Sequence, residues 1–450
     1  MSLLLLSALI LHSCSLGSHT HSDTLQEGTS ARTEPQDVTT ASDNSQFGLP
    51  ISTDNVQYCG WQDYITDGTY VIAAEGFQTG VIAKYHLETG SITTVCLKEG
   101  CAHHSVTIEN IPNANCPIPW GSSLFFVHNN KVYFKYSSAY YDEKELEETG
   151  STKPLRRWVF ASYDYITGEK QTILETEPND LGRIYTFKLV GEYIYYLRDI
   201  AQVEAPSTEE DYAHCLCRMR IDEYQEEILF DLSKAFPNHP PKAIPMVLAI
   251  DNQTVYFVCN ITGNVFFCSL SGENGEYLIN AEKEGFWGIY DAFGTFYLDG
   301  YIYFAKYVQE PLKAVCLYKM NAATGEKSIL TSDYLRWFFV TDHSIYYEMS
   351  QVMQPGEAQR NEAGEIGSYR YTIKQMNLDG TDAHVIGHID APHAETARPW
   401  GVGNAFFIQM RWKINISVTQ SIVGHYDVIF DVTNGNVIEV GKSDELRDEN

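Results

Sequence analysis

The chain has 450 residues, with 59 Asp and Glu against 31 Lys and Arg, which gives a formal net charge of −28 and an isoelectric point near 4.8. This balance excludes nucleic acid as the default partner and disfavours adsorption to an anionic membrane surface, because both need clustered cations. Hydrophobic residues make up 44% of the chain and aromatic residues 13%, enough to fill a large core.

The chain begins with an apolar run of signal-peptide length, residues 1–14, which is too short for a membrane-spanning helix. The run ends in Leu11-His12-Ser13-Cys14, which resembles the bacterial lipobox, where the cysteine is cleaved and diacylated. An ordinary secretory signal cut near Ser18 is the alternative. We therefore predict an exported protein, lipidated at Cys14 and held on the bacterial cell membrane only through that lipid, or else secreted.

Residues 15–55 are rich in Ser, Thr, Asp and Gln and contain almost no large apolar residue before Phe47. Such a segment buries too little surface to offset the entropy of ordering it, so we predict a flexible polar linker. The last residues, 442–450, are predicted to form an acidic tail.

Seven short segments of β-branched and aromatic residues recur between these ends, at intervals of 43 to 62 residues. They begin at Val71, Val132, Ile194, Val255, Ile302, Ile345 and Ala405. Each is followed by a second hairpin, and in six repeats its turn contains glycine, at Gly90, Gly168, Gly272, Gly325, Gly380 and Gly435. Glycine supplies the positive φ that such turns require. The third repeat has Ile221-Asp-Glu-Tyr224 instead.

Four short strands in each repeat predict an all-β fold, a seven-bladed β-propeller of four-stranded blades over residues 56–441. A single four-stranded sheet cannot bury both faces until neighbouring sheets pack against it radially. A helical solenoid is disfavoured, because an apolar period of 3.6 residues is absent from most of the chain. A pair of β-sandwiches or a β-helix is the alternative.

Two sequence segments within these repeats resemble a known family. Asp299-Gly-Tyr-Ile-Tyr-Phe304 and Val315-Cys-Leu-Tyr-Lys-Met-Asn321, followed by Thr324-Gly325-Glu326, resemble the propeller domains related to the low-density-lipoprotein receptor that occur in lipoproteins of Gram-positive gut bacteria. The resemblance covers residues 55–440 and implies the propeller fold. It implies no catalytic residue.

Cysteine and histidine cluster near the start of the repeats, at Cys59, Cys96, Cys101, His103 and Cys116. In an exported chain, one or two disulfides could staple the loop from residue 97 to 118. Zinc is an alternative, although the spacing lacks the tight Cys-x-x-Cys knuckle, and free thiols are a third. The family that the chain resembles carries a similar segment, of unassigned chemistry.

A second pair of cysteines, Cys259 and Cys268, is predicted to face each other across a turn at Gly263-Asn264, as a disulfide or as two buried thiols. No motif indicates a cofactor.

The loops that lead into each innermost strand of a propeller gather around its axis, so the residues just before the repeat segments are candidates for ligand contact. They are Trp120, Trp287, Trp400, Arg336, Trp337, Arg183 and Tyr185. Aromatic rings there could stack on sugar rings or peptide side chains, while polar groups set the orientation. Alternatively, each tryptophan packs a junction between blades.

The motifs of zinc proteases, serine hydrolases, Walker A loops and EF-hands are missing, so no catalytic residue is assigned and an enzyme is not indicated. We predict a cell-surface propeller that binds a glycan or a peptide, or that acts as a scaffold. One alternative is a hydrolase or lyase acting on polysaccharide, which would need two facing carboxylates. Another is a structural partner in a protein complex of the envelope.

Overall fold

The computed structural model describes residues 51–59, 64–73, 82–99, 101, 116–119, 122–140, 155–177, 183–204, 208, 211–236, 245–259, 264–280, 294–308, 314–332, 335–352, 368–392, 395–396, 399–415 and 420–448. The predicted leader, its Cys14 and most of the predicted linker lie outside these ranges.

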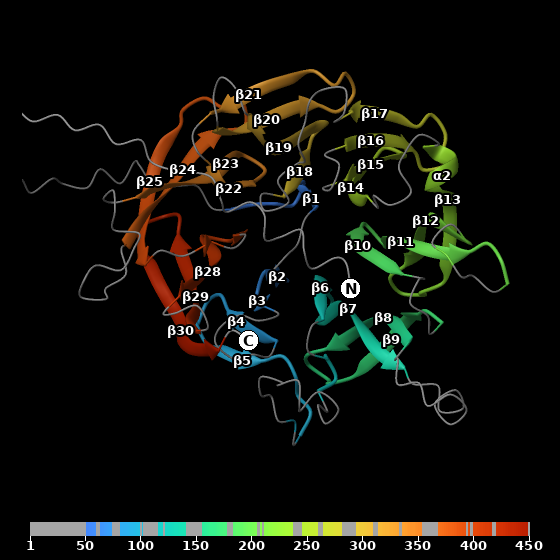
Figure 1. The fold of residues 1–450 in the computed structure, drawn as a ribbon, viewed down its shortest axis with the longest axis horizontal. Helices are drawn as coiled ribbons and strands as arrows, with labels where there is room; N and C mark the ends of the chain where they lie inside the picture. Colours follow the sequence, from blue (N-terminus) through green and yellow to red (C-terminus); the bar gives the residue numbers. More distant parts are fainter. Residues whose placement is uncertain are drawn as a thin grey trace, which may run out of the picture. The chain divides into compact units, whose positions relative to one another are not determined.

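Seven antiparallel sheets follow one another along the chain and confirm the predicted seven-bladed β-propeller (Figure 1). Blades 1 to 4 consist of β2 (Tyr64–Thr66), β3 (Tyr70–Ala73), β4 (Ala83–His86) and β5 (Ile92–Thr94); β6 (Ser123–His128), β7 (Lys131–Tyr140), β8 (Leu155–Asp164) and β9 (Lys170–Glu175); β10 (Ile184–Val190), β11 (Tyr193–Ala201), β12 (Tyr212–Arg220) and β13 (Glu226–Asp231); and β14 (Met246–Asp251), β15 (Thr254–Cys259), β16 (Asn264–Ser269) and β17 (Glu276–Ile279).

Blades 5 and 6 consist of β18 (Thr295–Leu298), β19 (Tyr301–Val308), β20 (Ala314–Asn321) and β21 (Lys327–Thr331), and of β22 (Leu335–Val340), β23 (Ser344–Val352), β24 (Ser368–Asn377) and β25 (His384–Pro392). In blade 7, two short segments, β26 (Glu395–Thr396) and β27 (Trp400–Val402), pair with β28 (Ala405–Asn415), and β29 (Gln420–Asp431) and β30 (Val437–Asp448) follow. One helical turn, α2 (Leu232–Ala235), follows blade 3. Within the described ranges, no helix has the length and apolar character needed to cross a bilayer.

The repeat segments found in the sequence all lie in the second strand of a blade, which is buried on both sides. The first residue of the segment is fully buried in six blades. In the seventh blade, the fully buried residues are the second and third, Phe406 and Phe407. Tyr133, Tyr196, Tyr303 and Tyr346 of these segments are also almost completely buried, as expected of side chains that fill the space between blades. Both faces of each second strand therefore depend on neighbouring blades for cover.

The turn between the third and fourth strands of a blade repeats one local design. In blade 2, the Asp164 carboxylate accepts hydrogen bonds from the backbone N–H groups of Ile166 and Thr167, and Gly168 closes the turn at φ 77°. Asn321 does the same in blade 5. In the third repeat, Tyr224 adopts a φ of 55° at the corresponding position. A local side-chain acceptor and a residue with positive φ thus make the turn, as the sequence pattern predicts.

The ring closes between the first and last blades by side-chain packing. Both β27 and β28 come from the C-terminal part of the chain, and β27 contacts β2 of blade 1. Tyr64 packs on Phe407, with ring centroids 6.0 Å apart, and its hydroxyl donates a hydrogen bond to the buried Asp427. No strand pairing between the two blades is needed for this contact.

The N-terminal segment of the described chain lies inside the ring. Strand β1 (Gln57–Cys59) pairs antiparallel with β18, on the edge opposite to β19 (Figure 1). The Gln57 side chain exchanges two hydrogen bonds with the backbone of Ile250, and Lys188 of β10 donates to the Tyr58 carbonyl at 2.8 Å. The segment therefore contacts the innermost strands of blades 3, 4 and 5.

The residues just before β1 bind to blades 6 and 7. The Ile51 N–H donates to the Gly403 carbonyl at 2.6 Å. Asp342, in the turn after β22, accepts hydrogen bonds from the Ser52 hydroxyl and from the N–H groups of Asp54 and Asn55. One carboxylate thus binds three residues of this segment, Ser52, Asp54 and Asn55, at the inner side of the ring.

Hydrogen bonds reach both ends of the described chain. The composition of residues 51–55 predicts a linker, and in the structure they are hydrogen-bonded to blades 6 and 7. Strand β30 extends to Asp448, so most of the predicted acidic tail, residues 442–450, continues the last strand of blade 7. In both places backbone pairing orders residues whose composition alone suggested a solvated segment.

We expect Gly294→Ala to weaken the attachment of β1. Gly294 has a φ of 69°, and an added Cβ would collide with the Tyr58 ring. Gly300→Ala is the matched control, because Gly300 has a φ of 78° with open space around it. The added collision should lower the free energy of unfolding by about 1–3 kcal/mol more than the control does. Denaturant unfolding measures this difference, and equal losses in both variants would contradict the packing described here.

Candidate ligand-binding site

Polar side chains gather on blade 3, where β10 begins and where β11 and β12 face each other. Asp199 lies directly opposite His214 in the strand register, and its Oδ1 lies 2.5 Å from the His214 Nδ1. The Tyr185 hydroxyl donates to the Asp199 Oδ2 at 2.7 Å. The Asp199 N–H donates to the Arg183 carbonyl at 2.9 Å. Two residues predicted from the sequence, Arg183 and Tyr185, are thus brought together with two that were not.

The electrostatics of this blade 3 cluster keep its tyrosine protonated. Burial raises the pKa of Tyr185, and the carboxylate of Asp199 raises it further, whereas Arg183 acts in the opposite direction. Tyr185 is therefore a hydrogen-bond donor at neutral pH. The Asp199 side chain is only 4% exposed and that of His214 is 19% exposed. A carboxylate at Nδ1 orients the imidazole and places the proton of the neutral ring on that nitrogen.

A second tyrosine borders the cluster on the same strand as His214. The hydroxyl of Tyr212 is buried and has no hydrogen-bond partner among the described residues. Burial raises its pKa, with added contributions from Asp199 and Asp211. Leaving a buried hydroxyl without a partner costs about 1–3 kcal/mol. A polar group of a ligand at this position would recover that cost.

An enclosed amine lies at the junction of blades 2 and 3, beside the start of β10. Lys135 of β7 donates a hydrogen bond to the Ile184 carbonyl at 3.1 Å, and its Nζ lies 4.7 Å from the centre of the Trp158 ring. Burial lowers the pKa of Lys135 to about 8. The amine therefore fixes the strand that carries Tyr185 to the neighbouring blade.

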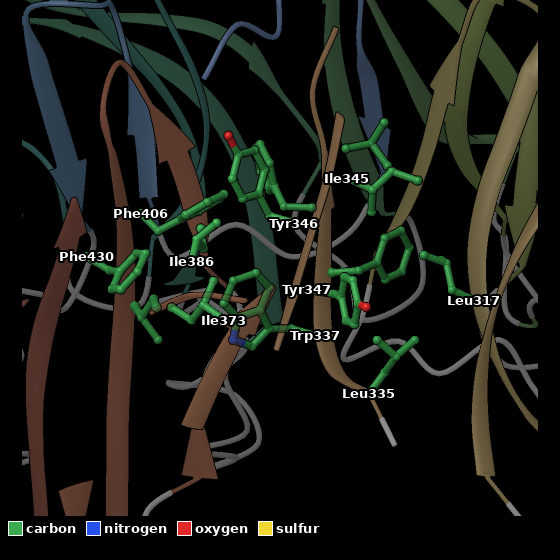
Figure 2. Packing of buried hydrophobic residues seen from close by; sticks show 14 of the residues in the cluster. Leu317, Leu335, Trp337, Ile345, Tyr346, Tyr347, Ile373, Ile386, Phe406 and Phe430 are labelled. Atoms are coloured by element: carbon green, nitrogen blue, oxygen red, sulfur yellow. The ribbon is translucent and has the colours of Figure 1, made fainter. Parts of the chain in front are cut away.

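Two of the predicted tryptophans pack within the fold. Trp337 is 1% exposed, and its indole N–H donates to the buried Glu348. Figure 2 shows it among the core side chains of blades 5 to 7, and its ring lies 5.5 Å from that of Phe406. As placed here, Trp337 is a core residue, because burying its large apolar surface is more favourable than exposing it. With 1% of its surface exposed, its side chain has almost no area to offer a ligand.

Trp400 is half-buried at the inner side of blade 7. Its ring makes edge-to-face contacts with Tyr58 of β1, at 5.7 Å, and with Phe339, at 5.5 Å. Its indole N–H is buried and has no hydrogen-bond partner in the described part of the chain. Arg336 lies in β22, but its side chain is not described, and Trp120 and Trp287 fall outside the described residues.

Three of the clustered cysteines come together between blades 1 and 2. The sulfur atoms of Cys96, Cys101 and Cys116 all lie within 4.8 Å of one another. Cys59 belongs to β1, but its side chain is not described, and His103 lies outside the described residues. The three cysteines are up to 20 residues apart in the sequence, and the fold brings their sulfur atoms together.

The predicted placement of Cys259 directly opposite Cys268 is wrong, whereas the alternative of two buried thiols is confirmed. In the register of β15 and β16, Cys259 lies opposite Asn264 and Cys268 lies opposite Val255. The connection between the strands is longer than the two-residue turn that the prediction assumed, and this moves the two cysteines apart along the ladder. Both are free, buried thiols.

The known structures that resemble this chain do so at low identity. No family model and no curated protein matches the chain. An oligogalacturonate lyase from Vibrio parahaemolyticus is 11% identical, covers 77% of this chain and 80% of its own, and has a TM-score of 0.39. A chain of the mitotic checkpoint complex is 8% identical, with 86% and 95% covered and a TM-score of 0.39. A chimera of ACO and RPE65 is 9% identical, with 86% and 71% covered and a TM-score of 0.28. These similarities transfer no activity.

Sequence reasoning missed Asp199, His214 and Tyr212. The two strands that carry them are joined by an insertion, so their partnership depends on a strand register that spacing does not reveal. The available signal was the alternation of polar and apolar residues from Tyr212 through His214 at the start of the strand.

We expect the stability gap between the wild type and Lys135→Gln to depend on pH. Lysine ordinarily has a pKa of 10.5, whereas burial lowers the pKa of folded Lys135 to about 8. Between these values the unfolded state binds the extra proton, so the free energy of unfolding of the wild type rises with pH relative to the variant, by about 3 kcal/mol. Urea unfolding at several pH values tests this; a gap that stays constant would contradict it.

Proposed function

We propose that this protein is an exported, lipid-anchored β-propeller that binds a glycan or a peptide outside the cell. The blade 3 cluster is the observation that supports this role most. It combines a carboxylate acceptor on Asp199, an imidazole on His214, a guanidinium on Arg183 and two tyrosine hydroxyls within one half-buried region. Sites that orient a polar ligand use a few convergent donors and acceptors of this kind.

A ligand rich in hydroxyl groups fits this composition best. A hydroxyl can donate to one group and accept from another, so it can pair with a tyrosine O–H and a carboxylate at once. The unpaired Tyr212 hydroxyl favours such a ligand, because a site with a buried polar group rejects ligands that leave that group unpaired. We therefore propose a glycan ahead of a peptide.

Binding of purified full-length protein to glycan and peptide arrays tests this proposal. We expect an oligosaccharide to bind, and we expect Asp199→Asn and His214→Asn to weaken its affinity at least tenfold, because each disrupts a charge-assisted pair in the site. His384→Gln is the matched control, since His384 is a half-buried histidine at the start of β25 in blade 6, outside the cluster. Unchanged affinity in both cluster variants would contradict the site. A stoichiometric envelope protein captured without any array ligand would favour the scaffold role.

We propose binding ahead of catalysis because of how the carboxylates are arranged. Hydrolysis of a polysaccharide needs two carboxylates that face each other across the substrate. Among the described residues, the buried carboxylates Glu348 and Asp427 accept hydrogen bonds from Trp337 and Tyr64 within the core. The blade 3 cluster contributes one buried carboxylate, that of Asp199.

The lipid anchor is proposed on the sequence Leu11-His12-Ser13-Cys14. Labelling of the native host with a radioactive fatty acid should mark the protein, and Cys14→Ser should abolish the label and release the protein into the medium. Cys316→Ala should keep the label, because its thiol is buried in blade 5. A Cys14→Ser protein that remains labelled and cell-bound would contradict this anchor.

A further inference from the structure

We propose that Cys96, Cys101 and Cys116 bind one thiophilic divalent cation, with zinc as the first choice. A zinc–sulfur bond of about 2.3 Å in tetrahedral geometry places sulfur atoms about 3.8 Å apart. The three sulfurs lie within 4.8 Å of one another, so shifts of about 1 Å or less bring them to this geometry. Zinc is preferred over calcium or magnesium, because soft thiolates favour it and the harder cations require oxygen ligands.

The backbone around the sulfurs already resembles the second coordination shell of a thiolate site. The N–H of Lys98 hydrogen-bonds to the Cys96 sulfur, and the N–H of Ile118 hydrogen-bonds to the Cys116 sulfur. In both cases the donor is two residues after the cysteine. Such N–H donors orient a thiolate and stabilise its negative charge. The same local geometry occurs on both sides of the site.

The site is held by the core between blades 1 and 2. Val95 and Ile118, each next to or near a cysteine, are buried together with residues of both blades. The hydroxyl of Tyr163, at the end of β8, accepts a hydrogen bond from the Leu97 N–H at 2.8 Å and also contacts the Cys96 sulfur. The cysteines are therefore fixed on rigid elements, which a preformed metal site requires.

A disulfide accounts less well for three convergent sulfurs. It would join two of them and leave the third thiol beside the bond, whereas one metal ion engages all three. The other five described cysteines with a placed side chain, Cys215, Cys217, Cys259, Cys268 and Cys316, are buried free thiols. A chain that keeps these thiols reduced in its blades does not depend on disulfides for its core.

The proposed metal would tie the segment after β5 to the segment before β6. Both segments lie on the connection between blades 1 and 2, which the propeller must hold without a shared strand. Binding displaces the three thiol protons to solvent. With three protein ligands identified, the fourth position is filled by water or by a donor beyond the described residues, and it decides whether the site is open or closed.

Metal analysis of the full chain tests this proposal. We expect the protein, purified under reducing conditions, to contain about one zinc ion and to lose more than nine-tenths of it in Cys101→Ala and in Cys116→Ala. Cys316→Ala is the matched control and should retain the metal, because Cys316 is a buried thiol remote from the site in blade 5. Loss of zinc in the control variant as well would overturn the assignment.

Cobalt substitution of the wild type avoids any dependence on how the variants fold. Cobalt(II) should produce the thiolate-to-metal charge-transfer absorption of a tetrahedral thiolate site, with saturation at one equivalent. Wild-type protein that takes up neither zinc nor cobalt after reduction would overturn the proposal. So would peptide mapping without reductant that finds Cys96, Cys101 or Cys116 joined in a disulfide in protein isolated from its native host.

Discussion

The structure depends on one constraint, which is that each four-stranded blade is apolar on both faces and must be covered on both. The second strands carry fully buried side chains at their first repeat position in six blades. An isolated sheet of this kind would expose them, and only a neighbour on each side removes that cost. A closed ring satisfies the requirement for every blade equally, and the contact of Tyr64 with Phe407 and Asp427 completes it between the first and last blades.

The N-terminal segment of the described chain lies inside this ring, against the innermost strands. Strand β1 adds to β18, and the Asp342 carboxylate binds the residues that precede β1. Trp400, predicted as a ligand contact, packs instead against Tyr58 of this segment. The candidate ligand site lies on blade 3, where Asp199 and His214 face each other on two neighbouring strands.

The two proposed sites lie at the ends of strands and on the connections between them. Lys135 joins blade 2 to the start of blade 3, and the three cysteines lie on the connection between blades 1 and 2. The blade faces are filled by close-packed apolar side chains, where an unpaired polar group is costly. The ends of the strands and their connections are the places where such groups can find partners. Both proposals, the ligand site and the metal site, therefore concern these ends.

The sequence alone determined the fold class, the number of blades, the second strand of each blade and the turns with positive φ. These features repeat locally, so a pattern of a few residues specifies each one. The third repeat departs from the glycine pattern, and there the structure shows Tyr224 with the positive φ. Only the tertiary structure decided that residues 51–59 enter the ring, that Trp337 is a core residue, and that Asp199 faces His214. These features depend on strand register and on contacts between distant segments. Neither can be derived from residue spacing when the lengths of the connecting loops are unknown, as Cys259 and Cys268 demonstrate.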